Sequence, residues 1–470
     1  CSFLESPMNK KIPILLCVLI AGCADAPDGS TSGETSVTSG AGGAAGSGEG
    51  GAAGNGGIGG NGGSGGNGGG MPEATGPIRY PPGLRHSPIA KSIVENGKTI
   101  LSTGLGRQDV FAKIGDSNTV NTGFLNCLSG NDVQLDTHTP LQSTIDYFKQ
   151  TLVDATKTSF NRTTLAAKVG WSSGDLLTGT PNPIDDELAA LTPAFAVVML
   201  GTNDTYVQGI EPFGNNMLRI VDLLAAKGVV PLLTTIPQRA DTADAAKMVL
   251  EMNALVRAVA QARQVPMLDL FGALEPIPDN GLVGDGIHLQ TYSNTSGSHA
   301  CWFDTNGLTE GMNQRNLITL EALDRSRRFF IQNEVPEPRP ADLVGEGTWT
   351  SPYEIDALPF VDDRNTQNKT TSEVDKYSCS MANEGGPEIV YRLKLDSQKN
   401  LRIRVVDDTA TDIDVHFLSD PGGANTCLGR SDKVLDVTAG PGTFWISADT
   451  YVDGMGNKLT GPYLLTVLEM

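Results

Sequence analysis

The most restrictive feature of this sequence is an unbroken apolar run from Ala194 to Leu200. Apolar residues without polar alternation are typical of a strand that is covered on both faces, because neither set of side chains then meets water. Similar predicted strands occur at 111–114, 165–169, 229–236 and 265–270. Between the last two, apolar residues from Ala245 to Val259 recur at helical spacing. Strands that alternate with helices predict a parallel sheet wrapped by helices.

The periodicity changes after the proline-rich segment 335–340. Beyond it, segments such as 401–406 alternate apolar and polar residues, and turn residues separate them. A period of two predicts half-buried strands, and their close spacing predicts a β-sandwich. We therefore predict an α/β domain over 77–335, a proline-rich linker over 336–349 and an all-β sandwich over 350–470.

The first residues have the order of an export signal. Met8 is the expected start, and a short basic segment at 9–11 precedes the apolar run 12–20, which is too short to cross a bilayer. The residues Ile-Ala-Gly then lead to Cys23. This pattern resembles the bacterial lipobox, in which the cysteine is acylated and becomes the mature N-terminus. We predict a leader and lipoprotein signal over 1–23, with a plain secretory signal as the alternative.

Residues 24–76 have a composition that does not support a folded core. From Ser39 to Gly70 the chain is nearly all Gly, Ala, Asn and Ser, which bury little apolar surface. A flexible coil of roughly 50 residues would span about 40 Å, so we predict a disordered tether. The predicted location is the bacterial cell envelope, with a lipid anchor at Cys23 that holds the protein to a membrane, or secretion if the signal is plain.

The formal net charge is −20. This charge argues against nucleic acid as a partner, because phosphate binding rewards clustered Lys and Arg. It fits an acidic, well-solvated surface, and it identifies no substrate.

Three of the seven cysteines fall in the predicted leader, which leaves four in the predicted domains: Cys127, Cys301, Cys379 and Cys427. An oxidising compartment favours disulfides, and four cysteines allow three pairings. We predict Cys127–Cys301 and Cys379–Cys427, because pairing across the linker would tie together two domains that composition keeps separate. No two cysteines have the C-x-x-C spacing of a zinc site, so we expect no zinc.

Polar residues with catalytic potential follow several of the predicted strands. Ser117 comes just after the first strand, Asn203 after the third, and Asp285 and His288 after the last. Ligands of open α/β sheets bind outside the carboxyl ends of the strands, so these segments can converge. A serine becomes a nucleophile when a histidine takes its proton and a carboxylate orients that histidine. We therefore predict Ser117 as the nucleophile and the Asp285–His288 pair, three residues apart on one turn, as its proton relay.

These residues, in this order, resemble the SGNH hydrolases, also called GDSL esterases and lipases. The resemblance spans the α/β domain in motif order and implies a flavodoxin-like parallel sheet and ester hydrolysis without a cofactor or metal. It also implies an oxyanion hole made by the Ser117 amide, a glycine and the Asn203 side chain. We place the glycine at Gly174, with Gly170 as the alternative. The family often has Leu after the serine, whereas this sequence has Asn118. We expect this difference to affect local packing and neither the nucleophile nor the base.

The predicted sandwich resembles bacterial pre-peptidase C-terminal domains. The resemblance rests on Asp412-x-Asp414 in a strand and on the segments 441–444 and 461–463. Four acids could supply oxygen ligands for calcium: Asp412, Asp414, Asp449 and Asp453. The equal alternative is that they are exposed acids of loops and turns that bind no metal.

Three functions are compatible with these residues. The first is hydrolysis of a small-molecule or polysaccharide ester. An acyltransferase would use the same residues and differ in how well water is excluded. A surface-binding lipoprotein with an inert hydrolase domain is the third. The complete set of nucleophile, relay and oxyanion donors favours the hydrolase. Outside this set, we expect His299 to have a structural role in a loop.

Overall fold

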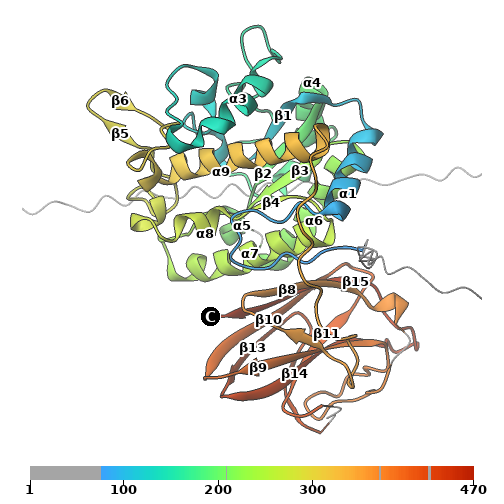
Figure 1. Cartoon of the computed structure of the whole chain (residues 1–470). Coiled ribbons are helices and arrows are strands. Elements are labelled where there is room, and N and C mark those ends of the chain that lie inside the picture. Colours follow the sequence, from blue (N-terminus) through green and yellow to red (C-terminus); the bar gives the residue numbers. More distant parts are fainter. Residues whose placement is uncertain (1–75, 208, 370–371, 422–424) are drawn as a thin grey trace, which may run out of the picture. The chain divides into compact units, whose positions relative to one another are not determined.

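The computed structural model describes residues 76–207, 209–369, 372–421 and 425–470, so the predicted leader and tether lie outside the described residues. Within this part, a parallel sheet comes first and two mainly antiparallel sheets follow (Figure 1). The predicted fold class, a parallel-sheet α/β domain followed by a β-sandwich, is confirmed.

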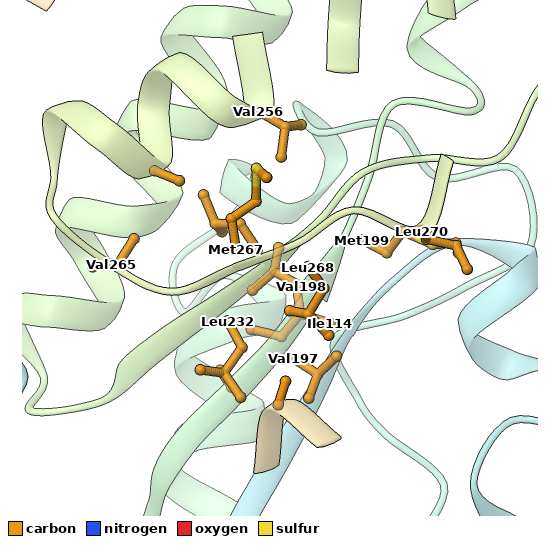
Figure 2. Packing of buried hydrophobic residues seen from close by; sticks show 14 of the residues in the cluster. Ile114, Val197, Val198, Met199, Leu232, Val256, Val265, Met267, Leu268 and Leu270 are labelled. Carbon is orange, nitrogen blue, oxygen red and sulfur yellow. The ribbon is translucent and has the colours of Figure 1, made fainter. Parts of the chain in front are cut away.

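The parallel sheet has the strand order β1–β2–β3–β4. Its strands are β1 (Arg107–Gly115), β2 (Pro193–Met199), β3 (Val230–Thr234) and β4 (Met267–Leu268). β2 is buried along its whole length, as its unbroken apolar run requires. Figure 2 shows the side chains of all four strands in one apolar cluster, among them Ile114, Val198, Leu232 and Leu268. This core fixes the strand ends that carry the polar motifs.

Helices cover this sheet, and Figure 1 shows α9 and α7 on opposite sides of it. The long helices are α1 (Lys91–Thr103), α6 (Ile210–Ala226), α7 (Ala243–Ala262) and α9 (Gly311–Ser326). Shorter helices are α2 (Ser117–Val120), α3 (Gln142–Lys149), α4 (Pro183–Leu191), α5 (Asp204–Val207) and α8 (Leu270–Leu274). α7 begins after Thr242, whose side chain accepts a hydrogen bond from the Ala245 amide. α6 ends before Gly228, whose φ of +77° suits glycine.

The segment 165–169, which we predict as a strand, forms only one bridge in the structure, between Gly115 and Ala167. The amide of Leu165 donates to the carboxylate of Glu187 at 2.8 Å and therefore does not extend a ladder. Apolar composition indicates a strand here, but a side chain distant in sequence competes for its backbone. The single parallel bridge still places the segment beside the end of β1, opposite β2.

The sandwich consists of sheets in the orders β13–β10–β15–β8 and β12–β11–β14–β9–β7. Its strands are β7 (Tyr353–Ile355), β8 (Phe360–Asn365), β9 (Glu388–Leu395), β10 (Lys399–Asp407), β11 (Ile413–Leu418), β12 (Cys427–Ser431), β13 (Val434–Ala439), β14 (Gly442–Thr450) and β15 (Pro462–Glu469). Alternate residues such as Ile403 of β10 and Val415 of β11 fill the core between the sheets. This is the arrangement that a period of two predicts.

The sandwich packs against the α/β domain within one compact unit. Val406 and Leu468 of the sandwich belong to the core cluster of the α/β domain. Glu251 of α7 is 1% exposed, and it accepts hydrogen bonds from Arg402 at 2.7 Å and Arg404 at 2.8 Å, both of β10. The two predicted domains are therefore joined by apolar burial and by a buried ionic contact.

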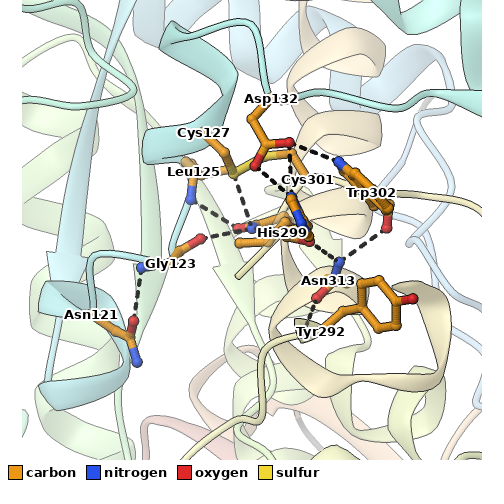
Figure 3. The surroundings of a disulfide bond; sticks show 12 residues. Asn121, Gly123, Leu125, Cys127, Asp132, Tyr292, His299, Cys301, Trp302 and Asn313 are labelled. Carbon is orange, nitrogen blue, oxygen red and sulfur yellow. Dashed lines mark hydrogen bonds and ion pairs between the residues drawn. A yellow bond between two sulfur atoms is a disulfide. The ribbon is translucent and has the colours of Figure 1, made fainter. Parts of the chain in front are cut away.

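The structure contains the disulfides Cys127–Cys301 and Cys379–Cys427, the two pairs expected from the sequence. Figure 3 shows the first of them, which joins residues 174 positions apart. Nearby, the side-chain amide of Asn316 donates to the carbonyl of Gly123 and to that of Ala300, so α9 holds both segments that the disulfide joins. This contact braces the loops that follow α2 and precede α9.

The four acids considered as calcium ligands do not all lie at one place. Asp453 lies in a turn and accepts hydrogen bonds from Asn457. Asp449 is buried and accepts a hydrogen bond from Tyr377. Asp414 forms an ion pair with Arg430, and Asp412 lies 3.6 Å from Lys433. Of the four, Asp412 and Asp414 lie together with Asp432, in a group in which one carboxylate oxygen of each lies within 4.8 Å of the others. Asp449 and Asp453 are not part of this group, so the predicted set of four is not assembled.

Candidate active site

The turn that carries Ser117 is determined by its immediate neighbours. A Cβ atom at Gly115 would lie 2.2 Å from Thr119 Oγ1 and 2.7 Å from the carbonyl oxygen of Met199, so only glycine fits between β1 and β2. Asp116 then caps α2, because its Oδ1 accepts a hydrogen bond from the Asn118 amide at 3.0 Å. The Gly-Asp-Ser sequence therefore ends the strand, begins the helix and leaves the Ser117 side chain half-buried.

A buried arginine holds this turn from the opposite side. Arg315 of α9 donates to the carbonyl of Asn118 at 2.5 Å and to Thr119 Oγ1 at 2.9 Å. Burial raises the pKa of Asp116, while the nearby Arg315 charge opposes that shift. Burial also lowers the pKa of Arg315 to about 9, against the attraction of Asp116. Sequence reasoning missed Arg315, since no motif marks it within its helix.

Asp285 and His288 lie in an irregular turn after α8. Asp285 Oδ1 accepts hydrogen bonds from the amides of Ile287 at 2.8 Å and His288 at 3.0 Å. Asp285 Oδ2 accepts one from His288 Nδ1 at 2.6 Å. Partial burial would raise the pKa of Asp285, but the hydrogen bonds from His288 and Ile287 together lower it. The carboxylate is thus ionised near neutral pH and holds the imidazole in one tautomer.

The structure brings Ser117 and His288 together although 171 positions separate them. Ser117 Oγ lies 2.9 Å from His288 Nε2, which completes a chain from hydroxyl to imidazole to carboxylate. The side chains of His288 and Asp285 remain 37% and 45% exposed. Asn118 contributes as well, because its Oδ1 accepts a hydrogen bond from the Leu289 amide at 3.3 Å. The residue that departs from the family pattern therefore ties the serine turn to the histidine loop.

The loop after the single bridge contacts the turn after β2. Asn203 Nδ2 donates to the carbonyl of Trp171 at 2.9 Å. Asp204 is buried and accepts hydrogen bonds from the amide and hydroxyl of Ser173. Burial raises the pKa of Asp204 to about 6, although the Ser173 hydrogen bonds oppose the shift. These contacts fix the loop that contains Gly174 against the turn that contains Asn203.

A second serine, histidine and carboxylate lie together near the Cys127–Cys301 disulfide, and Figure 3 shows the histidine and the carboxylate, His299 and Asp132. His299 Nε2 is 2.8 Å from Ser296 Oγ, and its Nδ1 is 3.0 Å from Asp132. The Ser296 hydroxyl, however, donates to Asn294 Oδ1 at 2.6 Å within its own turn, and the His299 ring stacks on Trp302 with centroids 3.9 Å apart. This cluster fastens the hairpin of β5 (Ser293–Asn294) and β6 (Gly297–Ser298), which is a structural role in a loop.

The comparisons with known proteins concern both domains. Residues 114–292 match the GDSL-like Lipase/Acylhydrolase family. A GDSL-like lipase from Bacteroides thetaiotaomicron is similar at 15% identity and a TM-score of 0.28, over 50% of this chain and 99% of that one. An acetyl-xylooligosaccharide esterase mutant from a Geobacillus species is similar at 15% identity and a TM-score of 0.30, over 47% of this chain and 95% of its own.

The pre-peptidase C-terminal domain of a collagenase from Bacillus anthracis is similar at 15% identity and a TM-score of 0.18, over 28% of this chain and 99% of that one. No curated protein matches the chain. The matched segment 114–292 begins in β1 and contains the serine, asparagine, aspartate and histidine described above. The chain therefore contains a GDSL-like lipase/acylhydrolase domain, and the protein is an enzyme that hydrolyses ester bonds.

Proposed function

We propose that the protein is an exported serine hydrolase in which Ser117, His288 and Asp285 cleave carboxylic esters. One observation carries this proposal: two consecutive hydrogen bonds join Ser117 Oγ to His288 Nε2 at 2.9 Å and His288 Nδ1 to Asp285 Oδ2 at 2.6 Å. This is the geometry in which a histidine can take the proton of a serine hydroxyl.

The reaction then proceeds in two halves. Ser117 Oγ attacks the ester carbonyl carbon while His288 Nε2 takes the hydroxyl proton. Asp285 stabilises the imidazolium, and His288 gives the proton to the departing alcohol, which leaves the acyl group on Ser117. In the second half, His288 takes a proton from water, the resulting hydroxide attacks the acyl carbon, and the acid leaves as the serine recovers its proton.

The negative charge that develops on the carbonyl oxygen requires donors already in place. We assign this role to the amides of Ser117 and Gly174 and to the side-chain amide of Asn203. Asn203 Nδ2 carries two hydrogens, and the Trp171 carbonyl accepts one of them at 2.9 Å. That contact orients the amide and leaves the second hydrogen for the substrate.

Two glycines compete for the remaining oxyanion donor. Gly174 follows Ser173, which Asp204 holds beside the Asn203 turn through hydrogen bonds at both its amide and its hydroxyl. Gly170 is exposed, has a φ of +83° and has open space where a Cβ atom would stand. A donor must be held rigidly to stabilise charge, so we favour Gly174.

The exposure of the relay bears on the substrate. His288 and Asp285 are 37% and 45% exposed, so water can reach an acyl group on Ser117, which favours hydrolysis over transfer. An open relay also admits an alcohol much larger than the acyl group. We therefore propose short acyl esters, acetyl above all, of a polysaccharide or a comparably large alcohol.

A panel of p-nitrophenyl esters from acetate to laurate, together with acetylated xylan, tests the reaction and its substrate. We expect kcat/KM to be highest for acetate and to fall with chain length, with acetate released from the xylan. A fluorophosphonate should add its mass to the peptide that contains Ser117. An absence of both turnover and adduct would instead support the surface-binding alternative, and a preference for laurate would contradict the short-acyl assignment.

We further propose that Cys23 carries a lipid that anchors the protein to a membrane of the cell envelope. The proposal rests on the sequence, because residues 1–75 lie outside the described residues. A basic segment at 9–11, an apolar run at 12–20 and Cys23 stand in the order of a lipoprotein signal. In the part of the chain that the structure describes, no helix has the length and apolar character needed to cross a membrane.

Replacing Cys23 by serine is expected to remove the lipid, because the cysteine sulfur is the atom to which the lipid would be attached. The variant should leave the membrane fraction or accumulate as its uncut precursor. Intact mass of the membrane-extracted wild-type protein measures the modification directly. As a control, an ordinary cleavable signal in place of residues 8–23 should give an enzyme with unchanged kcat. A mature N-terminus at Cys23 without added acyl mass would contradict the anchor and favour secretion.

A further inference from the structure

Arg239 is a buried cation whose side chain donates every one of its hydrogens to a protein acceptor. It is 1% exposed. Its Nε and Nη2 donate to the two oxygens of Asp241 at 2.7 and 2.8 Å. Its Nη1 donates to the Thr202 carbonyl at 2.5 Å and to Thr205 Oγ1 at 3.1 Å, and Nη2 also donates to the Tyr206 hydroxyl. A guanidinium has five N–H donors in a rigid plane, so this set is complete and allows one geometry.

We propose that Arg239 is a positioning residue, which fixes the Asn203 amide relative to His288. Three acceptors of Arg239 lie in the turn 202–206, which contains Asn203. The guanidinium carbon lies 4.5 Å from the centre of the Tyr206 ring, and the Tyr206 amide donates to the Asn203 carbonyl at 3.0 Å. Asn203 therefore cannot shift without breaking charged contacts at both ends of its turn.

The backbone beside Arg239 also contacts the loop 285–288. The amide of Ala240 donates to the carbonyl of Gly286 at 2.8 Å. Gly286 has a φ of +71°, and a Cβ atom on it would lie 2.9 Å from the amide nitrogen of Asp241. Glycine is required there, and the loop rests directly on residues 240–241. One short segment thus contacts the turn that carries the oxyanion donor and the loop that carries the base.

This contact matters because each of the two loops carries a residue that acts on the same ester carbonyl group. The proposal rests on the proposed function, in which His288 moves the proton and Asn203 stabilises the oxyanion. A donor stabilises developing charge only at hydrogen-bond distance, and a displacement of about 1 Å can cost about 10²-fold in rate. Arg239 touches neither reacting atom, so its loss should lower kcat while KM changes little.

A double-mutant cycle on p-nitrophenyl acetate hydrolysis tests the proposal. We expect Asn203→Ala to lower kcat by about 10²–10³-fold. Arg239→Met, which keeps side-chain length but removes all five donors, should lower kcat by about 10²-fold and change KM by less than about threefold. Once Asn203 is alanine, adding Arg239→Met should lower kcat by less than about fivefold, because no amide remains to be positioned. Losses that simply multiply would overturn the proposal.

Arg257→Met is the matched control for the loss of a buried arginine. Arg257 lies in α7 and donates to the carbonyl of Pro359 at 2.5 Å. We expect this variant to have a lower Tm and an unchanged kcat. Arg239→Lys replaces Arg239→Met if the latter does not fold, and the same non-additivity with Asn203→Ala is expected.

Ser117→Ala in the same assay separates the two proposals. Turnover by Ser117→Ala would contradict the proposed function. A wild-type kcat in Arg239→Met, beside an inactive Ser117→Ala, would contradict the positioning role alone. An equal loss of kcat in Arg257→Met would also overturn that role, because destabilisation would then explain both losses.

Discussion

Ser117→Ala is expected to lower kcat toward p-nitrophenyl acetate by a factor on the order of 10⁶, the cost of removing the nucleophile from a serine triad. The hydroxyl 2.9 Å from His288 Nε2 is lost, and no other group in the turn replaces it. Asp116 still caps α2 through the Asn118 amide, so Tm should stay close to that of the wild type. Labelling by a fluorophosphonate should disappear together with turnover.

Ser296→Ala is the matched control, because Ser296 is also hydrogen-bonded to a histidine. Its hydroxyl lies 2.8 Å from His299 Nε2, but it donates to Asn294 and fastens a hairpin. We expect this variant to keep its kcat and its fluorophosphonate adduct. The opposite pattern, an active Ser117→Ala with an inactive Ser296→Ala, would move the active site to the second cluster.

The largest loss of stability is expected from Glu251→Ala. Glu251 is 1% exposed and accepts hydrogen bonds from Arg402 and Arg404, which are 26% and 11% exposed. Removing one partner of a buried ionic contact typically costs about 3–5 kcal/mol, because the remaining charge is left without its counterion. Partial exposure of Arg402 reduces this cost, so we expect the free energy of unfolding to fall by about 2–4 kcal/mol. Urea unfolding monitored by circular dichroism measures the change.

Asp436→Ala controls for the general effect of losing an acid beside Arg402. Asp436 pairs with Arg402 at 2.6 Å but is 59% exposed, so its removal should cost less than about 1 kcal/mol. Replacing Glu251, Arg402 and Arg404 together by apolar residues should restore part of the lost stability, since no buried charge then remains unpaired. Equal effects of Glu251→Ala and Asp436→Ala would show that the contact between the domains contributes little.

The nucleophile turn could be predicted because its determinants are local. A Cβ atom at Gly115 would clash with Thr119, and Asp116 caps a helix that begins at the next residue. The fold class could also be predicted from the sequence. Burial on both faces of β2 leaves an unbroken apolar run, and burial on one face leaves an alternation in the strands of the sandwich.

The residues that hold the site together could not be predicted in this way. Arg315 and Arg239 look like ordinary surface charges in the sequence. Both are buried where a distant segment supplies acceptors: the serine turn for Arg315, and the turn 202–206, in addition to the neighbouring Asp241, for Arg239. Glu251 likewise has the spacing of a solvent-facing helix residue until the sandwich covers it. The prediction of a strand at 165–169 was wrong for the same reason. The Leu165 amide donates to the carboxylate of Glu187, and local periodicity does not predict a contact with a residue so far along the chain.

The hydrogen bonds from Arg315 to the serine turn have a consequence for when the enzyme becomes active during its synthesis. Arg315 lies 197 positions after Asn118, whose carbonyl it binds, and Asp116 is buried beside it. A nascent chain that has not yet reached α9 contains the nucleophile but lacks the cation that holds its turn. Esterase activity would therefore begin only once the whole α/β domain has emerged. If the chain is exported from its N-terminus, as proposed above, ester hydrolysis would begin only on the far side of the membrane.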